Sequence, residues 1–340
     1  MPLPRDLWVT PLAGMVGGYL ASLAGWPLPW MVGSLLAVIA VRCLADRPFS
    51  ELPGGRKAGQ WLVASGIGLH FTSDVLEQVL SHLPVIVMGA FGTLLLSLIG
   101  IAILRRAGVD RATAFFASMP GGASEMVNLA LRHDAQPARV AAAHSLRLLL
   151  VVLLIPALFT WGLPDVSAPP RAPVDWTWLA GLLAAGAVLA VLWGRLKQPN
   201  PWMLGPLVAC AVASASFDLH LGLPQGMGQL GQWLIGCALG CHFDRAFFRS
   251  APGFLARVLA FTLLAMLAAA ALGEALGWLA GEDHLSLMLG MMPGGITELC
   301  LTAEALQLSV ALVTALQVLR LFLVMFLAEP LFKLWCKSHA

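Results

Sequence analysis

A long internal repeat governs this sequence. The second half restates the first at an offset of 172 or 173 residues, about half the length of the 340-residue chain. Three motif pairs carry the repeat: PWMVGSLLA at 29–37 with PWMLGPLVA at 201–209, GQWLVASGIGLHF at 59–71 with GQWLIGCALGCHF at 231–243, and MPGGASE at 119–125 with MPGGITE at 292–298. In a hydrophobic chain, two long similar halves are typical of a transporter whose substrate lies where the repeats meet. The repeat therefore predicts a pseudo-symmetric fold.

Composition places the chain in a membrane. Hydrophobic residues make up 59% of it, charged residues only 11%, and the mean hydropathy is +0.83, whereas a soluble domain carries about 25% charged residues. The net charge is only +2, and the basic residues lie in short loops, so no nucleic-acid partner is expected. The sequence predicts an all-α, polytopic membrane protein without a cofactor.

Apolar windows of ~20 residues predict about ten crossing helices, five in each of two membrane repeats, 1–165 and 166–340. They lie near 7–24, 30–46, 59–80, 83–104 and 137–162, and again near 175–193, 201–217, 230–248, 252–278 and 307–332. Each repeat also contains a shorter, broken segment. These segments are 111–131, interrupted at Pro120, Gly121 and Gly122, and 284–303, interrupted at Pro293, Gly294 and Gly295.

The distribution of Lys and Arg bears on whether the broken segments cross the membrane or re-enter it. Basic residues gather at 42–57, 105–111, 132–139, 195–197, 245–249 and 333–337, whereas the loops around 74–82, 218–229 and 274–284 have none. If both broken segments return to the side they entered, every basic cluster falls on the cytoplasmic side. This favours five crossings plus one re-entrant segment per repeat, inverted topology and both termini in the cytoplasm. Crossing stays an alternative, because two arms end to end could just span ~30 Å.

The residues after each Pro-Gly-Gly start a new helix. Ser124 and Glu125, and Thr297 and Glu298, occupy its first turn. The free amides and positive dipole end there suit an anion, and carbonyls freed by the break could hold a cation. The structural alternative is that the Ser and Thr are ordinary N-caps, that the Glu simply suits a helix N-terminus, and that Pro-Gly-Gly is an ordinary turn. Ionisable groups at membrane depth are costly and usually functional, so the two glutamates are candidates for coupling substrate movement to a proton or cation.

An arginine follows each glutamate by 22 residues, inside an otherwise apolar helix: Arg147 after Glu125 and Arg320 after Glu298. A charge at that depth needs a partner. Two alternatives are open: an internal ion pair with a glutamate, or a clamp for an anionic substrate.

Four further polar residues stand near these positions or recur. His144, one turn before Arg147, corresponds to Gln317, so both are candidates to line the cavity. Asn128, one turn after Glu125, has no polar counterpart in the second half. The repeat-paired His70 and His242 lie late in their predicted spans, which favours a helix-end role.

The doubled PWM[VL]G, GQWL and MPGG[AI][ST]E pattern over essentially the whole chain resembles the AbrB family of bacterial membrane proteins, whose members are often labelled ammonia monooxygenases or regulators. A copper monooxygenase needs clustered histidines, and the eight in this chain form no pair at i, i+3 or i+4, so no metal site is expected. More remotely, the architecture resembles inverted-repeat secondary carriers with broken helices. The resemblance implies a multi-pass protein of the bacterial inner membrane and, by analogy, a homodimer with a scaffold and a moving transport domain.

Together these features predict a secondary transporter of small anionic or zwitterionic metabolites, driven by a proton or cation gradient, rather than an enzyme. Two alternatives stay open. One is an intramembrane enzyme with Ser124 as nucleophile and His144 as base, which would also need an orienting acid and an oxyanion site. The other is a passive channel.

Overall fold

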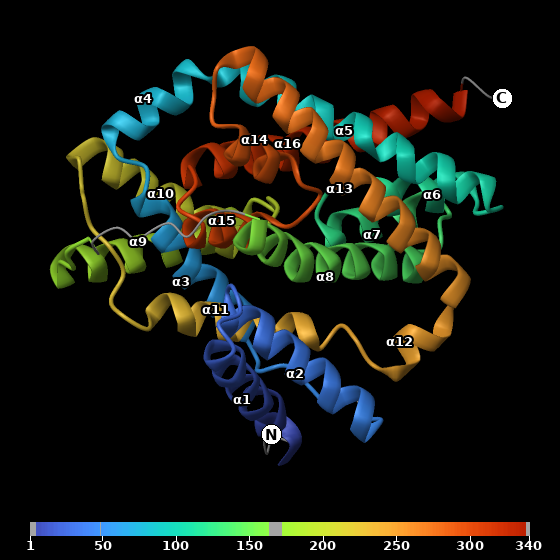
Figure 1. Cartoon of the computed structure of the whole chain (residues 1–340), viewed down its shortest axis with the longest axis horizontal. Helices are drawn as coiled ribbons and strands as arrows, with labels where there is room; N and C mark the ends of the chain where they lie inside the picture. Colours follow the sequence, from blue (N-terminus) through green and yellow to red (C-terminus); the bar gives the residue numbers. More distant parts are fainter. Residues whose placement is uncertain (1–4, 48, 163–171, 338–340) are drawn as a thin grey trace. The chain divides into compact units, whose positions relative to one another are not determined.

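The computed structural model describes residues 5–47, 49–162 and 172–337, and all of its regular structure is helical. Sixteen α-helices follow a short 3-10 helix, Arg5–Trp8 (Figure 1). The helices of the first half are α1 (Val9–Leu23), α2 (Pro29–Ala45), α3 (Gly55–Leu69), α4 (Ser73–Ser81), α5 (Leu83–Arg106), α6 (Arg111–Ser118), α7 (Ala123–Arg132) and α8 (Pro137–Gly162). Those of the second half are α9 (Trp176–Arg195), α10 (Pro201–Phe217), α11 (Met227–Gly240), α12 (Arg245–Ser250), α13 (Pro252–Ala280), α14 (His284–Met291), α15 (Ile296–Ala305) and α16 (Val310–Lys337).

The backbone conformation recurs at the same offset as the sequence. Every described residue with a positive φ has a counterpart 172 or 173 residues away that also has one. The pairs are Gly25 and Lys197, Leu28 and Asn200, Asp46 and Asp218, Gly54 and Gly226, Gly108 and Gly281, and Asp134 and Gln307. Residues other than glycine rarely adopt this conformation, so the matching turns are a conformational repeat and not a consequence of composition alone.

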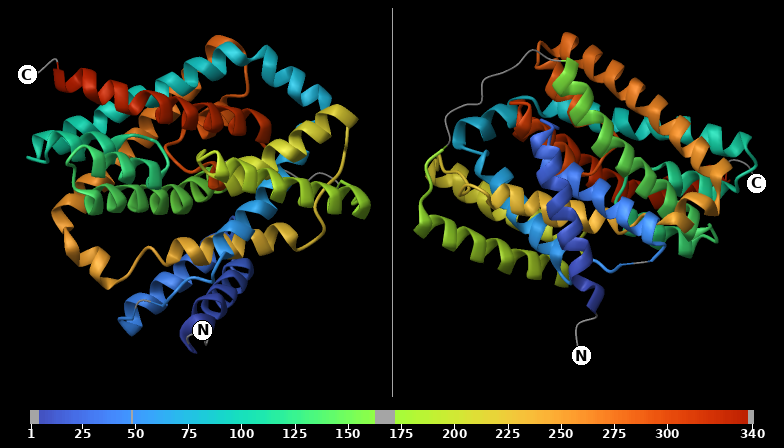
Figure 2. Two further views of the ribbon diagram at one scale, coloured as in Figure 1. Left: turned by 180° about the vertical axis from the view of Figure 1, so that it is seen from behind. Right: turned by 60° about the horizontal axis from the view of Figure 1, so that its bottom comes forward.

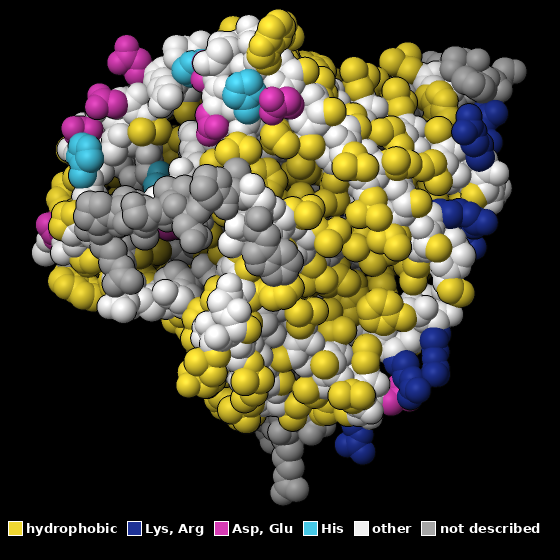
Figure 3. Space-filling view, viewed as in Figure 1, with side chains coloured by type: hydrophobic (Ala, Val, Ile, Leu, Met, Phe, Trp, Pro, Cys, Tyr) yellow, Lys and Arg dark blue, Asp and Glu magenta, His cyan; other side chains and the backbone are white. Residues whose placement is uncertain are grey.

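Five of the described helices are long and apolar enough to cross a membrane: α5, α9, α13, α16 and the part of α8 from Pro137 to Thr160. Three shorter helices, α1, α2 and α10, are also apolar. Large hydrophobic side chains on α5 and α13 are exposed, among them Leu95, Leu98, Leu264 and Leu267, and hydrophobic side chains cover much of the surface in Figure 3. These are the features of a multi-pass helical membrane protein.

Two predicted spans are wrong in their extent. The expected helix at 59–80 is divided into α3 and α4, and the expected helix at 230–248 is divided into α11 and α12. The backbone N–H groups of Phe71 and Phe243 each donate to a carbonyl three residues earlier, which closes the first helix of each pair. The Asp244 carboxylate then accepts from the N–H of Phe247 and starts α12. A hydropathy window averages over such short turns.

The helices form two compact units, and each unit contains matching elements of both halves. Unit 1 comprises Met1–Gln78, Pro156–Ser250 and Ala305–Gln307, and unit 2 comprises Val79–Ile155, Ala251–Glu304 and Leu308–Ala340. In unit 1, α1 packs on α2 as α9 packs on α10, while α2 contacts α11 as α10 contacts α3. The helices of the two halves are therefore interleaved within this unit.

The glycine of the PWM[VL]G motif permits close helix packing in unit 1. A Cβ at Gly33 would overlap the carbonyl oxygen of Gly17, so α2 lies against the backbone of α1. At the matching position, a Cβ at Gly205 would lie 2.5 Å from the backbone nitrogen of Ala190 on α9. This motif belongs to the core of unit 1.

Gly33→Ala is expected to destabilise the protein, because the new methyl group meets a backbone atom that cannot rotate away. Overpacking of this kind costs about 1–3 kcal/mol. Gly181→Ala is a suitable control, because a Cβ there meets nothing within 4 Å. Thermal unfolding in detergent should show a lower midpoint for Gly33→Ala than for the wild type and no decrease for Gly181→Ala. Equal midpoints for the two variants would contradict the packing argument.

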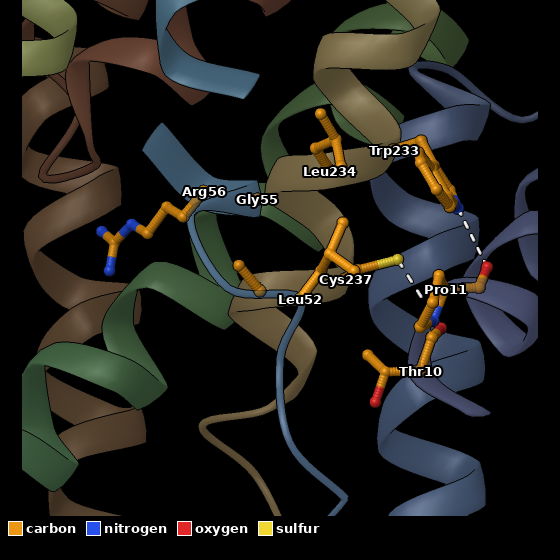
Figure 4. A pocket seen from close by; sticks show the side chains of 9 residues that line it. Thr10, Pro11, Leu52, Gly55, Arg56, Trp233, Leu234 and Cys237 are labelled. Atoms are coloured by element: carbon orange, nitrogen blue, oxygen red, sulfur yellow. Dashed lines mark hydrogen bonds between the residues drawn. The ribbon is translucent and has the colours of Figure 1, made fainter. Parts of the chain in front are cut away.

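The GQWL motif also serves packing in unit 1. A Cβ at Gly59 would lie 2.8 Å from the carbonyl oxygen of Gly231, where α3 crosses α11. The Trp61 indole donates to the carbonyl of Leu183 at 3.1 Å, and the Trp233 indole donates to the carbonyl of Pro11 at 3.2 Å. Figure 4 shows the second of these bonds beside a small cavity between α1 and α11. Each bond joins a helix of the first half of the chain to a helix of the second half.

Candidate functional site

The third motif, MPGG, lies in unit 2, and each of its two copies separates the two short helices of a pair. The first pair is α6 and α7, and residues 119–122 separate them. Asp110 caps α6 by accepting from the N–H of Thr113 at 2.7 Å. Gln136, which follows α7, donates its backbone N–H to the Thr113 hydroxyl at 2.8 Å and its side-chain amide to Asp110 at 3.2 Å. The start of α6 and the chain after α7 therefore meet, and the two helices form a hairpin with its tip at Pro120.

The second pair, α14 and α15, is closed in the same way. Asp283 caps α14 by accepting from the N–H of Leu285 at 3.2 Å and from the Ser286 hydroxyl. The backbone N–H of Ser309, which follows α15, donates to that hydroxyl at 2.8 Å. Asp283, Ser286 and Ser309 correspond by the 173-residue offset to the three residues that close the first hairpin. This cap was not predicted; its signal in the sequence is an Asp followed three residues later by Thr or Ser.

The two hairpins begin at opposite ends of α5. The first follows the C-terminal end of α5 after a short turn. The second begins beside the N-terminal end of α5, because the His82 imidazole before α5 contacts the Glu282 carboxylate before α14. The start of α8 follows the first hairpin, near the C-terminal end of α5. There the Arg139 guanidinium lies 5.6 Å from the centre of the Phe254 ring, which places the start of α13 near the start of α8. The long helices α5 and α13 therefore pack antiparallel, side by side in Figures 1 and 2.

The two hairpin tips meet at one cavity in unit 2. Ser118 and Pro120 line it from the first tip, Met291 and Pro293 line it from the second, and Arg147 lines it from α8. Residues of α5 and α13 complete the wall. The cavity measures about 20 Å³, which is room for one or two water molecules. The prolines of both Pro-Gly-Gly breaks line this cavity.

Three hydroxyl groups on the cavity wall were not anticipated. Thr93 and Ser97 on α5 and Ser118 on α6 each donate to a carbonyl of their own helix at 2.6–2.7 Å. The spacing of Thr93 and Ser97, one turn apart in an apolar span, is the signal that could have identified them. Their oxygen lone pairs add hydrogen-bond acceptors to the wall.

Arg147 and His144 hold the first tip from α8, and both are buried. The Arg147 guanidinium donates to the carbonyl of Met119 at 3.1 Å, and its other terminal nitrogen lies 2.9 Å from Nδ1 of His144. The Nε2 of His144 lies 3.0 Å from the carbonyl of Phe116. The two side chains satisfy carbonyls that the end of α6 leaves without helical partners.

Arg320 and Gln317 hold the second tip from α16. Arg320 donates to the carbonyls of Met292 at 2.8 Å and Gly294 at 2.7 Å, and Gln317 donates to those of Gly290 at 2.6 Å and Met292 at 3.2 Å. Arg320 is 4% exposed and Gln317 is fully buried. Within the described residues, Nε of Arg320 and Oε1 of Gln317 have no hydrogen-bond partner. The second tip therefore retains one free donor and one free acceptor.

The ion pair considered for each arginine is absent. Among the described residues, the side-chain contacts of Arg147 and Arg320 are the carbonyls and the histidine given above, and neither arginine pairs with a glutamate. The two guanidinium groups also lie close enough to repel each other. Unit 2 thus has two buried positive charges at the hairpin tips.

The glutamates instead fold over the start of their own helices. A Cβ at Gly122 would overlap the Glu125 carboxylate, and a Cβ at Gly295 would overlap that of Glu298. Gly122 is the N-cap residue of α7, so Glu125 occupies the position from which a carboxylate can reach back to the cap. The second glycine of each Pro-Gly-Gly makes room for this carboxylate.

The two tips differ in exposure. Ser124 and Asn128 are exposed and Glu125 is half-buried, whereas Thr297 and Glu298 are buried, at 3% and 6% exposure. The Ser124 hydroxyl donates to Glu125 at 3.2 Å. None of these five side chains lines the cavity that the tips enclose. Of the predicted polar side chains, Arg147 is the one that lines it.

A Ser124–His144 catalytic pair does not form. Both ring nitrogens of His144 are engaged, one with Arg147 and the other with a backbone carbonyl, and the exposed Ser124 bonds to its neighbour. In the described ranges, no three His, Cys, Asp or Glu side chains are grouped closely enough to hold a metal ion. The paired His70 and His242 lie at the ends of α3 and α11, where their Nδ1 atoms contact helix carbonyls at 3.0 and 3.2 Å.

The chain is similar to two named bacterial proteins and matches one family along most of its length. Over 371 aligned positions it is 28% identical to "Uncharacterized protein YhjN" of Bacillus subtilis (strain 168), covering 99% of this chain and 94% of that protein. It is also 28% identical over 273 positions to "Putative regulator AbrB" of Escherichia coli (strain K12), covering 78% of each. Residues 30–336 match the family described as "Transition state regulatory protein AbrB". Because that match includes both hairpins and both buried arginines, the chain belongs to the AbrB family.

Proposed function

We propose that this protein is a secondary transporter of small anionic or zwitterionic metabolites, with its substrate site at the two hairpin tips of unit 2. The observation that carries the proposal is a pair of buried arginines from matching helices at these tips, neither of which forms an ion pair with a described residue. A buried cation without a counter-ion is costly. A carboxylate between the tips would offset that cost, and guanidinium groups bind carboxylates in a defined geometry.

The hairpins support a re-entrant, inverted arrangement. In each, the outer ends of the two short helices meet and the tip lies between α5 and α13. Basic residues surround the open end of the first hairpin, namely Arg105, Arg106, Arg111, Arg132 and Arg139, whereas Glu274, Glu282, Asp283 and Glu304 lie near that of the second. By the positive-inside rule, the first hairpin would open to the cytoplasm of a bacterial cell and the second away from it, with both termini cytoplasmic.

A cavity of about 20 Å³ is too small for a metabolite, because a single water molecule already needs about half of that volume. Transport through this site therefore requires the tips to separate from the helices that enclose them. The tips are suited to such a change, because backbone and side-chain hydrogen bonds, rather than continuous helix, hold them in place. Alternating exposure of one site is how broken-helix carriers work.

The glutamates stay the candidates for coupling to a proton or cation gradient. Glu298 is buried at the start of α15 and Glu125 is half-buried at the start of α7. Binding or release of a proton at either carboxylate would change how the cap holds its helix. The homodimer expected by analogy stays a prediction.

Uptake into sealed proteoliposomes tests the proposal. The probes are acetate, lactate, malonate, succinate, alanine and glutamate, with an imposed pH or Na⁺ gradient. We expect saturable, gradient-dependent uptake of at least one probe. Glu298→Gln should lower it more than tenfold, since the variant keeps the side-chain shape and removes the charge. Glu304→Gln, an exposed site on the same helix, is the matched control. Normal uptake by Glu298→Gln would remove this residue from the mechanism.

A further inference from the structure

We propose that His144 carries the coupling proton, and that proton binding there and anion binding at Arg147 promote each other. This rests on the proposed transport function and identifies the coupling ion as H⁺. The geometry of one contact carries the inference. His144 and Arg147 both hold the first hairpin tip and also contact each other, at 2.9 Å between Nη2 of the arginine and Nδ1 of the histidine.

The contacts fix the protonation state of the imidazole. A carbonyl oxygen only accepts, so Nε2 of His144 bears the proton that it donates to Phe116. A guanidinium only donates, so Nδ1 of His144 must present its lone pair to Arg147. The ring is therefore neutral, with its hydrogen on Nε2. Its one free site for a proton is the atom that accepts from Arg147.

A proton on Nδ1 and the present position of Arg147 exclude each other. The lone pair that accepts from the guanidinium is the one a proton would occupy, and two donors would then face each other. Protonation would release that guanidinium nitrogen from His144, and Arg147 already lines the cavity. An anion that draws Arg147 into the cavity would conversely free Nδ1 to take up a proton. Its negative charge would also offset the added positive charge beside Arg147 and Arg320. By thermodynamic linkage, each binding event strengthens the other.

The other titratable groups near this contact are otherwise occupied. On the helices of the two hairpins, Glu125 and Glu298 lie over the glycines of their own caps. On α16, Arg320 is bonded to the second tip and acts on Arg147 through its charge. On α6, which supplies the Phe116 carbonyl, the titratable side chain is Arg111 at the first residue. The charged group in contact with His144 is Arg147.

The second half lacks such a group. Gln317 takes the place of His144 and donates to two carbonyls of its own tip, but an amide does not titrate near neutral pH. From this difference we expect one coupled proton per transport cycle, bound by the first half of the chain. It also supplies a natural replacement, because His144→Gln would install the amide that the chain already uses at the matching position of the second half.

Proton uptake on anion binding tests the proposal. Lactate and malonate are titrated calorimetrically into the purified full-length protein in two buffers of different ionisation heat, which gives the number of protons taken up per anion. We expect about one for the wild type, with affinity falling up to about tenfold per pH unit as pH rises, as linkage of one proton requires. His144→Gln and His144→Asn, whose amides can still donate to Phe116, should give a value near zero and an affinity that no longer varies with pH. Glu304→Gln, at an exposed site on α15, should retain proton uptake.

Three outcomes would overturn the proposal. If His144→Gln and His144→Asn bind the anion with undiminished proton uptake, His144 is not the proton site. If Glu298→Gln removes the uptake and the His144 variants keep it, the proton resides on Glu298. Either result would contradict the proton site and leave the proposal of anion transport standing. If the folded wild-type protein binds neither these anions nor the other carboxylates of the uptake panel, the proposed function fails, and the proton site falls with it.

Discussion

Arg147→Gln is expected to weaken anion binding by at least about 30-fold. The guanidinium is the one cationic side chain on the cavity wall that the tips enclose, and removal of the charged partner of a buried ion costs about 2–5 kcal/mol. At 1.4 kcal/mol per tenfold change, the dissociation constant for malonate or lactate should rise by about 30-fold to more than 1,000-fold. Calorimetric titration of the purified protein measures it.

Arg132→Gln is the matched control for this loss of charge. Arg132 is exposed at the end of α7, and its replacement also removes one positive charge from the first hairpin. This variant should bind the anion as the wild type does. Arg320→Gln should weaken binding in the same direction as Arg147→Gln and also destabilise the second tip, because it loses donors to Met292 and Gly294. Equal affinities of Arg147→Gln and Arg132→Gln would refute the anion site.

Gly295→Ala is expected to disrupt the second tip. The added methyl group would overlap the Glu298 carboxylate and lie 3.3 Å from Leu148, and Glu298 is buried and has little room to move. Overpacking costs about 1–3 kcal/mol, and the buried carboxylate would have to move from its place beside Gly295. We expect a lower midpoint of thermal unfolding and loss of transport.

The first half provides the control. Gly122→Ala creates the same overlap with Glu125, but the three described atoms nearest to the new Cβ all belong to that half-buried glutamate. Glu125 can turn away, so the effect on unfolding should be smaller. The double variant Gly295→Ala with Glu298→Ala should recover part of the lost stability, since it removes the overlap. If the double variant is no more stable than Gly295→Ala, the carboxylate is not what the glycine accommodates.

The repeat made the helix boundaries of the tips predictable. Pro120 and Pro293 lie between helices that end at Ser118 and Met291 and resume at Ala123 and Ile296, because proline and glycine interrupt helical hydrogen bonding. The closure of each hairpin was not predicted, since it depends on Gln136 and Ser309 contacting side chains 23 residues earlier. Spacing within a sequence does not reveal such contacts.

The partners of the charged residues were also beyond prediction. Equal spacing from Glu125 to Arg147 and from Glu298 to Arg320 is compatible with an ion pair, but it does not give the direction of either side chain. The glutamates turn back over their caps, and the arginines turn to carbonyls that the breaks set free. A glutamate at the helix start describes these positions better than the ion pair, but the expected serine cap is wrong for α7, whose N-cap is Gly122 without a side-chain cap. Burial distinguishes Glu298 from Glu125, although their motifs are alike.

Counterflow of a labelled carboxylate in proteoliposomes tests the central claim most directly. Vesicles are loaded with unlabelled probe from the uptake panel, diluted into a trace of the same labelled compound, and followed over time. A carrier predicts transient accumulation of label above its equilibrium level, absent from vesicles with Arg147→Gln and present with Arg132→Gln. A channel gives a monotonic approach to equilibrium, and that time course, or accumulation unaffected by Arg147→Gln, would contradict the account.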